Sequence, residues 1–388
     1  MRRTAAALTA LVLLAGCGGG SKAPLGHPKI GAKSSDKEAA TELGFPSFAT
    51  ANTTRVGGAD ATADAAAVAR AVYPGGSPES RPPAVTLVDA SDWRAGVAAS
   101  VLMAHPLGAP VLLSDGATLP PASEDALNAL QPTGAKAAGG AQVIRIGAVA
   151  TPSGYRTAEI AGRGPFALAH AIDAYVAAAH GSPSGSVLVV SSQDPEYAMP
   201  AAGWAAKSGD PVLFTLRDRL PAETRRALAA HDGARIYVLG PPSAVSGRVL
   251  TSLRKLGRVT RIAGGTPVTN AVAFARFADG GFGWGVTDPG HGFVFVNGAR
   301  TMDAVAAAPL SASGSYGPLL LLDSATQLAQ PLRNYLLDVQ PGYTADPVRG
   351  VYNHGWIVGD AAAISLGAQA RLDELLRIVP VSSQQSGP

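Results

Sequence analysis

The chain has 388 residues, a formal net charge of +3, and a single cysteine, and 15% of its residues are charged. Its length allows two or three domains, and a hydrophobic fraction of 47% is typical of a globular protein. The low charge argues against a nucleic-acid partner, and one cysteine excludes an internal disulfide framework and a cysteine-based zinc site.

The N-terminus has the pattern of an export signal. Two arginines precede an apolar run over 5–15, which is shorter than the ~20 residues that a membrane-spanning helix needs. The sequence Leu14-Ala15-Gly16-Cys17 that follows resembles the lipobox of bacterial lipoproteins. The resemblance implies cleavage before Cys17 and lipid on its sulfur, which would anchor the exported chain to a membrane. Residues 1–17 are therefore predicted to be a lipoprotein signal with its lipidated cysteine.

A stretch over 18–54 is rich in Gly, Ser, Ala and Lys and has no apolar periodicity, which predicts a flexible tether. Beyond it, four landmarks recur in the same order three times. They are a short opening segment before an Ala-rich helix, an apolar strand, an apolar strand that begins with X-Pro, and a closing strand with a glycine turn. The opening segments are 55–58, 159–162 and 261–264, and the closing strands are 143–147, 236–240 and 356–359.

These landmarks divide the chain into repeats over 55–152, 153–257 and 258–380, followed by a tail over 381–388. Short continuous apolar strands that alternate with helices favour parallel sheets covered by helices on both faces. The sequence thus predicts an α/β protein.

The third repeat carries a family resemblance. It has Arg-Ile-Ala-Gly at 261–264, Asn-Gly at 297–298, Asp-Ala-Val-Ala-Ala-Ala-Pro-Leu at 303–310, and Ile-Val-Gly and Ala-Ile-Ser near its end. This order resembles the type-2 cell-wall-binding repeat. The resemblance implies three tandem Rossmann-like or flavodoxin-like modules with parallel sheets, packed around an approximate threefold axis. It also implies attachment to anionic polymers of the bacterial cell wall.

The polar residues of the pattern vary more than its scaffold. The second repeat has Glu159 in place of the leading arginine, and the aspartate of the second helix, Asp303 in the third repeat, is Ala95 in the first. We therefore expect the fold to be kept even where the polar groups differ.

Candidate binding residues lie at the repeat openings and in the loops after strands, where open α/β sheets bind ligands. Guanidinium forks match phosphate or carboxylate oxygens, but the same arginines are equally suited to pairing with local acids. An aromatic ring there stacks on a sugar or covers an apolar helix. The candidates are Arg55, Asp92, Trp93, Arg94, Arg163, Gln193, Asp194, Arg261, Asn297, Arg300 and Asp303.

The sequence carries no convincing catalytic, metal or cofactor pattern. The seven histidines have no metal-binding spacing, and the glycines over 162–167 fit a dinucleotide pattern without the strand that should precede it. Asp194 and Glu196 fit a pair of carboxylates for glycoside cleavage, but an aspartate before Pro195 is also a helix-cap signature.

We therefore predict a non-catalytic, exported lipoprotein without cofactor or metal, held at the membrane through Cys17. Its three repeats are predicted to bind an anionic cell-wall polymer or another partner in the cell envelope. The alternatives are a solute-binding lipoprotein of a transporter and an envelope carbohydrate hydrolase.

Overall fold

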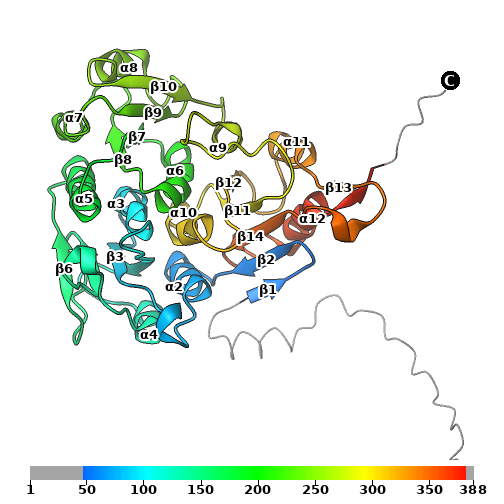
Figure 1. The fold of residues 1–388 in the computed structure, drawn as a ribbon, viewed down its shortest axis with the longest axis horizontal. Helices are drawn as coiled ribbons and strands as arrows, with labels where there is room; N and C mark the ends of the chain where they lie inside the picture. Colours follow the sequence, from blue (N-terminus) through cyan, green and yellow to red (C-terminus); the bar gives the residue numbers. More distant parts are fainter. Residues whose placement is uncertain (1–46, 382–388) are drawn as a thin grey trace, which may run out of the picture.

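The computed structural model describes residues 47–381, which form an α/β body with three main sheets (Figure 1). The export signal, Cys17 and residues 18–46 lie outside the described residues, as does 382–388. The predicted tether is too long, because strands β1 (Ser47–Ala49) and β2 (Thr53–Val56) pair antiparallel within the body. Their short polar sequence hid these strands from the periodicity analysis.

Each main sheet has four parallel strands in the same order. In each sheet, the strand that follows the opening helix lies between the X-Pro strand and the closing strand of the same repeat. The central strands are buried on both faces, as their apolar runs predict.

The first sheet is β4 (Val111–Ser114), β3 (Val85–Asp89), β5 (Val143–Ile146) and β6 (Thr157–Ile160). The second is β8 (Val212–Thr215), β7 (Ser186–Ser191), β9 (Arg235–Leu239) and β10 (Arg258–Ile262). The third is β12 (Leu319–Leu322), β11 (Gly292–Asn297), β14 (His354–Val358) and β2, with β1 at its edge. This arrangement confirms the predicted α/β fold class with parallel sheets.

The sheets do not follow the predicted repeat boundaries. The opening strand of each repeat joins the sheet of the repeat before it: β6 pairs with β5, and β10 pairs with β9. The third sheet receives β2, the opening strand of the first repeat, which pairs with β14. The three repeats are therefore linked in a closed cycle, in which the N-terminal strand completes the C-terminal sheet.

The helices follow the same cycle. Helices α3 (Trp93–Ala99), α6 (Pro195–Ser208) and α10 (Thr301–Ala307) come after the first strands and contact one another at the centre (Figure 1). The opening helices α2 (Ala61–Val72), α5 (Pro165–His180) and α9 (Pro267–Arg276) each contact the central helix of the preceding repeat. The remaining helices are α4 (Pro121–Leu130), α7 (Ala222–Ala229), α8 (Gly247–Leu253), α11 (Gln330–Asp338) and α12 (Leu366–Leu376).

Two glycines allow the central helices to pack closely. A Cβ on Gly96 of α3 would lie 2.7 Å from Cγ2 of Val305 on α10, and one on Gly203 of α6 would lie 2.7 Å from Oγ of Ser311. Real Cβ atoms do not approach other heavy atoms so closely, so a larger residue would push the repeats apart. Within residues 47–381, no helix has both the length and the apolarity to cross a membrane.

Candidate functional site

The loops after the first strand of each sheet hold most of the candidate binding residues. These loops lie at the carboxyl ends of parallel strands, the edge at which such sheets bind ligands. All three begin with the same backbone contact to the second strand. The N–H groups of Ala90, Ser192 and Gly298 donate to the carbonyls of Ser114, Thr215 and Leu322 at 2.8, 2.9 and 2.7 Å.

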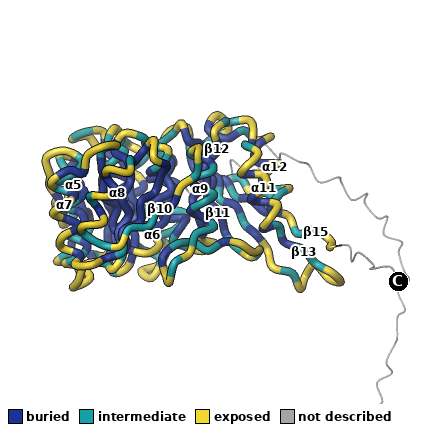
Figure 2. The backbone as a smooth tube through the Cα atoms, turned by 90° about the horizontal axis from the view of Figure 1, so that it is seen from above, coloured by how far each residue is buried: buried dark blue, intermediate teal, exposed yellow. Residues whose placement is uncertain are grey.

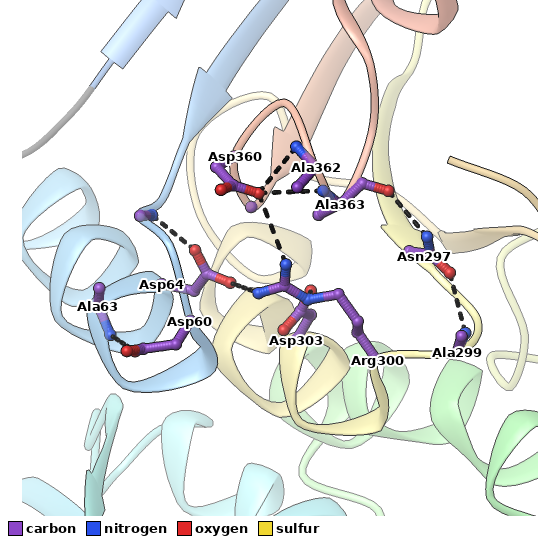
Figure 3. A network of polar contacts seen from close by, with 12 residues as sticks. Asp60, Ala63, Asp64, Asn297, Ala299, Arg300, Asp303, Asp360, Ala362 and Ala363 are labelled. Atoms are coloured by element: carbon purple, nitrogen blue, oxygen red, sulfur yellow. Dashed lines mark hydrogen bonds and ion pairs between the residues drawn. The ribbon is translucent and has the colours of Figure 1, made fainter. Parts of the chain in front are cut away.

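The third of these loops carries a buried charged cluster (Figure 3). Arg300, at the N-cap of α10, lies between three carboxylates, at 2.7 Å from Asp303, 3.3 Å from Asp64 and 3.6 Å from Asp360. Asp64 and Asp303 are 0% and 1% exposed, and the Arg300 side chain keeps 25% exposure. Because Asp64 lies on α2, this closing cluster (Asp64, Arg300, Asp303 and Asp360) joins the third repeat to the first.

Burial sets the protonation of the closing cluster. Loss of solvent, together with the nearby charge of Asp303, raises the pKa of Asp64 to about 8, although the N–H of Gly58 donates to its Oδ1 at 2.7 Å. Burial also raises the pKa of Asp303 to about 6, against the opposing charge of Arg300. At neutral pH the pair therefore holds a proton, mainly on Asp64, and Asp303 is the carboxylate that pairs with Arg300.

Arg55 lies in buried contacts with the chain itself, which favours a structural role over the ligand-binding role that the sequence left open. It is 8% exposed, and its Nη1 donates to the carbonyls of Gly359 and Asp360 at 2.7 and 2.8 Å. Its Nη2 donates to Ile364 O at 2.6 Å and its Nε to Gln369 Oε1 at 3.0 Å. Burial lowers the pKa of Arg55 to about 10, which leaves it charged at neutral pH. The guanidinium therefore fixes the turn after β14 instead of facing solvent.

An arginine makes similar contacts at the other two junctions, and at one of them this favours a structural role for Arg261 as well. Arg261 donates to the carbonyls of Gly240 and Val245, each at 2.5 Å, in the turn after β9. At the third junction the opening strand carries Glu159, and an arginine lies on the neighbouring strand instead. Arg145 lies opposite Glu159 in the β5–β6 register, pairs with it at 3.1 Å, and donates to Val149 O and Ala150 O at 3.0 and 3.1 Å. Sequence analysis missed Arg145, although a charged residue inside the apolar strand Val-Ile-Arg-Ile was a usable signal.

Asn297 and Asp92 hold the backbone of their own loops. The buried Asn297 donates from Nδ2 to Ala363 O at 2.8 Å and accepts the N–H of Ala299 at 2.9 Å. Asp92 caps α3 by accepting the N–H groups of Arg94 and Ala95, both at 3.1 Å. Both side chains are therefore occupied by backbone groups of the chain itself.

Trp93 and Arg94 join the first repeat to the second. The half-buried Trp93 packs edge-on against Phe214 of β8, with ring centroids 5.8 Å apart. Arg94 lies over the Trp93 ring at 4.7 Å and donates from Nε to Ser192 O at 2.7 Å. The packing interpretation of Trp93 therefore fits better than stacking on a sugar.

The remaining candidates lie in the second repeat. Gln193 accepts the N–H of Arg217 at 2.9 Å, and Asp194 accepts the hydroxyl of Ser191 at 2.8 Å at the N-cap of α6. Arg163 is exposed, and no hydrogen bond or ion pair of its side chain is seen among the described residues. The candidates thus lie at three separate junctions, and four of the five arginines are occupied by groups of the chain itself.

A cavity of about 390 Å³ opens at the carboxyl ends of β11 and β12. Its lining includes Thr266 and Pro267 at the start of α9, Leu322 of β12, and the carboxylates Glu196 and Asp323. Glu196 thus lines a cavity, whereas Asp194, its partner in the carboxylate-pair hypothesis, accepts a hydrogen bond from Ser191. Within residues 47–381 no three His, Cys, Asp or Glu side chains are grouped to hold a metal ion.

Residues 261–368 match the family described as cell wall binding domain 2, CWB2. This segment of the third repeat is therefore similar to a cell-wall-binding repeat, in agreement with the resemblance seen in its sequence. No curated protein matches the chain.

Two solved structures have a similar fold. Cwp6 from Clostridium difficile has a TM-score of 0.66 and 16% identity over 84% of this chain and 48% of its own. Cwp8 from the same organism has a TM-score of 0.64 and 18% identity over 88% of this chain and 53% of its own. The chain thus spans about half of each relative, and identity this low shows a common fold.

Replacing Arg55 with Ala should lower the free energy of unfolding by about 3 kcal/mol, because buried carbonyls lose a charged donor. Urea unfolding of both proteins measures the difference. Arg163→Ala is the matched control and should change it by less than about 0.5 kcal/mol. Equal effects of the two variants would contradict the structural role of Arg55.

The free energy of unfolding should fall as pH rises from about 4 to about 8. Asp64 and Asp303 have raised pKa values in the folded state, so this state binds more protons than the unfolded chain over that range. Asp64→Asn should make the pH dependence shallower and stabilise the protein at pH 8, measured by urea unfolding.

This substitution has a precedent within the chain. Asn270 is the fourth residue of α9, as Asp64 is of α2, and its Oδ1 accepts the N–H of Gly264 at 3.3 Å. Asp60→Asn, at an exposed cap on the same helix, is the control and should not stabilise the protein at pH 8. An unchanged slope in Asp64→Asn would show that Asp64 does not take up the proton.

Proposed function

We propose that the chain is a non-catalytic binding protein of the bacterial cell envelope, which attaches to a cell-wall polymer and is anchored to the membrane by lipid on Cys17. The match of residues 261–368 to the cell-wall-binding family is the observation that carries the proposal. The closed cycle of three sheets supports it, because Cwp6 and Cwp8 share this fold.

The occupied arginines sharpen the proposal. Arg55 and Arg261 hold turns of the chain and Arg300 pairs with buried acids, so these guanidinium groups are not free to hold phosphates or carboxylates of an anionic polymer. Replacing them to test binding would disturb the fold. The polymer must therefore contact other groups, and sugar rings offer hydroxyls and apolar faces besides their charges.

The purified chain should sediment with insoluble bacterial cell walls. A globular protein of similar isoelectric point is the control, since a sequence pI of about 9.0 alone promotes adhesion to anionic walls. Repeating the measurement on walls stripped of their anionic polymers tells which polymer is bound. If the chain sediments no better than the control at physiological salt, the binding function is wrong.

Cys17→Ser should release the protein from the membrane fraction. The substitution removes the sulfur that carries the lipid, and stable anchoring of a protein to a membrane takes more than one lipid chain. The experiment expresses the full chain in a bacterium that processes lipoproteins and removes the wall before fractionation, so that wall binding does not hold the variant. Ser21→Ala is the control and should remain membrane-bound. Retention of Cys17→Ser in the membrane would refute lipid anchoring.

A further inference from the structure

The third repeat has two long loops at the amino-terminal edge of its sheet. Its loops before β11 and β14 cover 277–291 and 339–353, whereas those before β7 and β9 in the second repeat cover 181–185 and 230–234. The segment with β13 (Gly342–Tyr343) and β15 (Val379–Pro380) extends from one end of the body (Figure 2). This edge lies opposite the closing cluster, which is at the carboxyl ends of the strands.

A buried asparagine holds the two long loops together. Asn353 is 2% exposed, and its Oδ1 accepts the N–H groups of Gly290 and His291 at 2.8 and 3.1 Å. Its Nδ2 donates to Val339 O at 2.8 Å, so one side chain satisfies groups of both loops. A buried amide that bonds backbone groups of both loops fixes its surroundings, so the surface that these loops form is preorganised.

These loops border a cleft of about 250 Å³. Its polar and aromatic lining consists of His291, Ser315, Tyr316, Tyr352 and His354, together with three glycines and no carboxylate. Tyr316 and Tyr352 are 48% and 54% exposed, which is unusual for large aromatic side chains. The Tyr352 hydroxyl donates to Pro347 O at 2.7 Å, which restrains its ring.

A second cavity, of about 400 Å³, follows the first along the segment 312–316. Ala312 and Ser313 line this larger cavity, and Ser315 and Tyr316 line the cleft. Lys207 of α6 also lines the larger cavity and places its Nζ 3.7 Å from the centroid of the Tyr316 ring. A positive charge from the lining of the larger cavity therefore contacts an aromatic ring from the lining of the cleft.

We propose that the two cavities form one groove that binds a sugar chain of the cell wall. Tyr316 and Tyr352 contact the apolar faces of sugar rings, and Lys207 contacts a negatively charged substituent. This inference rests on the proposed wall-polymer function and gives it a location. Rigid tyrosines supply contact area at little entropic cost, and the histidines and Ser315 supply donors and acceptors for hydroxyl groups.

Two of the large exposed apolar side chains line the groove. Among the described residues, the large exposed apolar side chains all lie in the third repeat and its end: Tyr316, Leu337, Val348, Val351, Tyr352, Leu366 and Val381. Tyr352 lies in the long loop 339–353, which has no counterpart of that length in the second repeat. Binding here therefore does not need the arginines that close the cycle.

The test compares the purified full chain with the double variant Tyr316→Ala/Tyr352→Ala in sedimentation with titrated insoluble cell walls. The variant should need about 10-fold more wall for half-retention, since two aromatic contacts are lost. The single variants to Phe should keep near-normal retention. Leu366→Ala, an equally exposed apolar change outside the groove, is the control. Lys207→Gln should weaken retention relative to the control Lys255→Gln, and less so at high salt.

The outcomes separate the two proposals. If the unchanged chain sediments with walls and the double variant does so equally well, the groove is wrong and the wall-binding function stands. If Glu196→Gln/Asp323→Asn abolishes retention while the tyrosine variant does not, the polymer binds at the carboxyl-end cavity, which also overturns the groove. If the unchanged chain is not retained, the proposed function itself fails, and the groove with it.

Discussion

The cyclic exchange of strands is the constraint on which the rest of the structure depends. Each sheet receives its fourth strand from the next repeat, and the third sheet receives β2 from the start of the chain. The backbone groups of a strand in such a sheet bond to the neighbouring strands. Because one of the four strands comes from another repeat, no repeat completes its sheet alone. The helices repeat the exchange, because α2, α5 and α9 each pack on the central helix of the preceding repeat. Stability is thus shared among the three repeats.

This constraint explains what the most recognisable residues do. The opening arginine lies on the exchanged strand, and its guanidinium holds the turn after the neighbouring closing strand, as Arg55 and Arg261 do. The exchange of charges at Arg145 and Glu159 keeps the same contacts with the arginine on the opposite strand. The residues by which the repeats are recognised in the sequence therefore serve to close the cycle. Under the proposed function, ligand recognition falls to residues outside this set.

The sequence predicted the elements well and their pairing poorly. Apolar runs with turn signals located the strands, and glycine and proline located the helix ends, because these patterns depend on local geometry. The exchange of β6 and β10 was not predictable, because periodicity does not say which edge a strand joins. The roles of Arg55 and Asn297 were missed for a related reason. A polar residue near a loop looks the same in sequence whether it faces solvent or closes a buried contact with residues some 300 positions away.

In the third repeat, closure of the cycle and binding of a ligand need different surfaces. Its carboxyl-end loops hold the closing cluster, where Asp64 and Asp303 are buried against Arg300, and a ligand that drew Arg300 away would leave these acids without their cation. Binding at that point would therefore oppose the closure of the cycle. The long loops at the opposite edge take no part in this closure. Asn353 holds them by bonding backbone groups of both loops. A chain anchored through Cys17 and holding wall sugar at this edge would link membrane to wall without weakening its own fold.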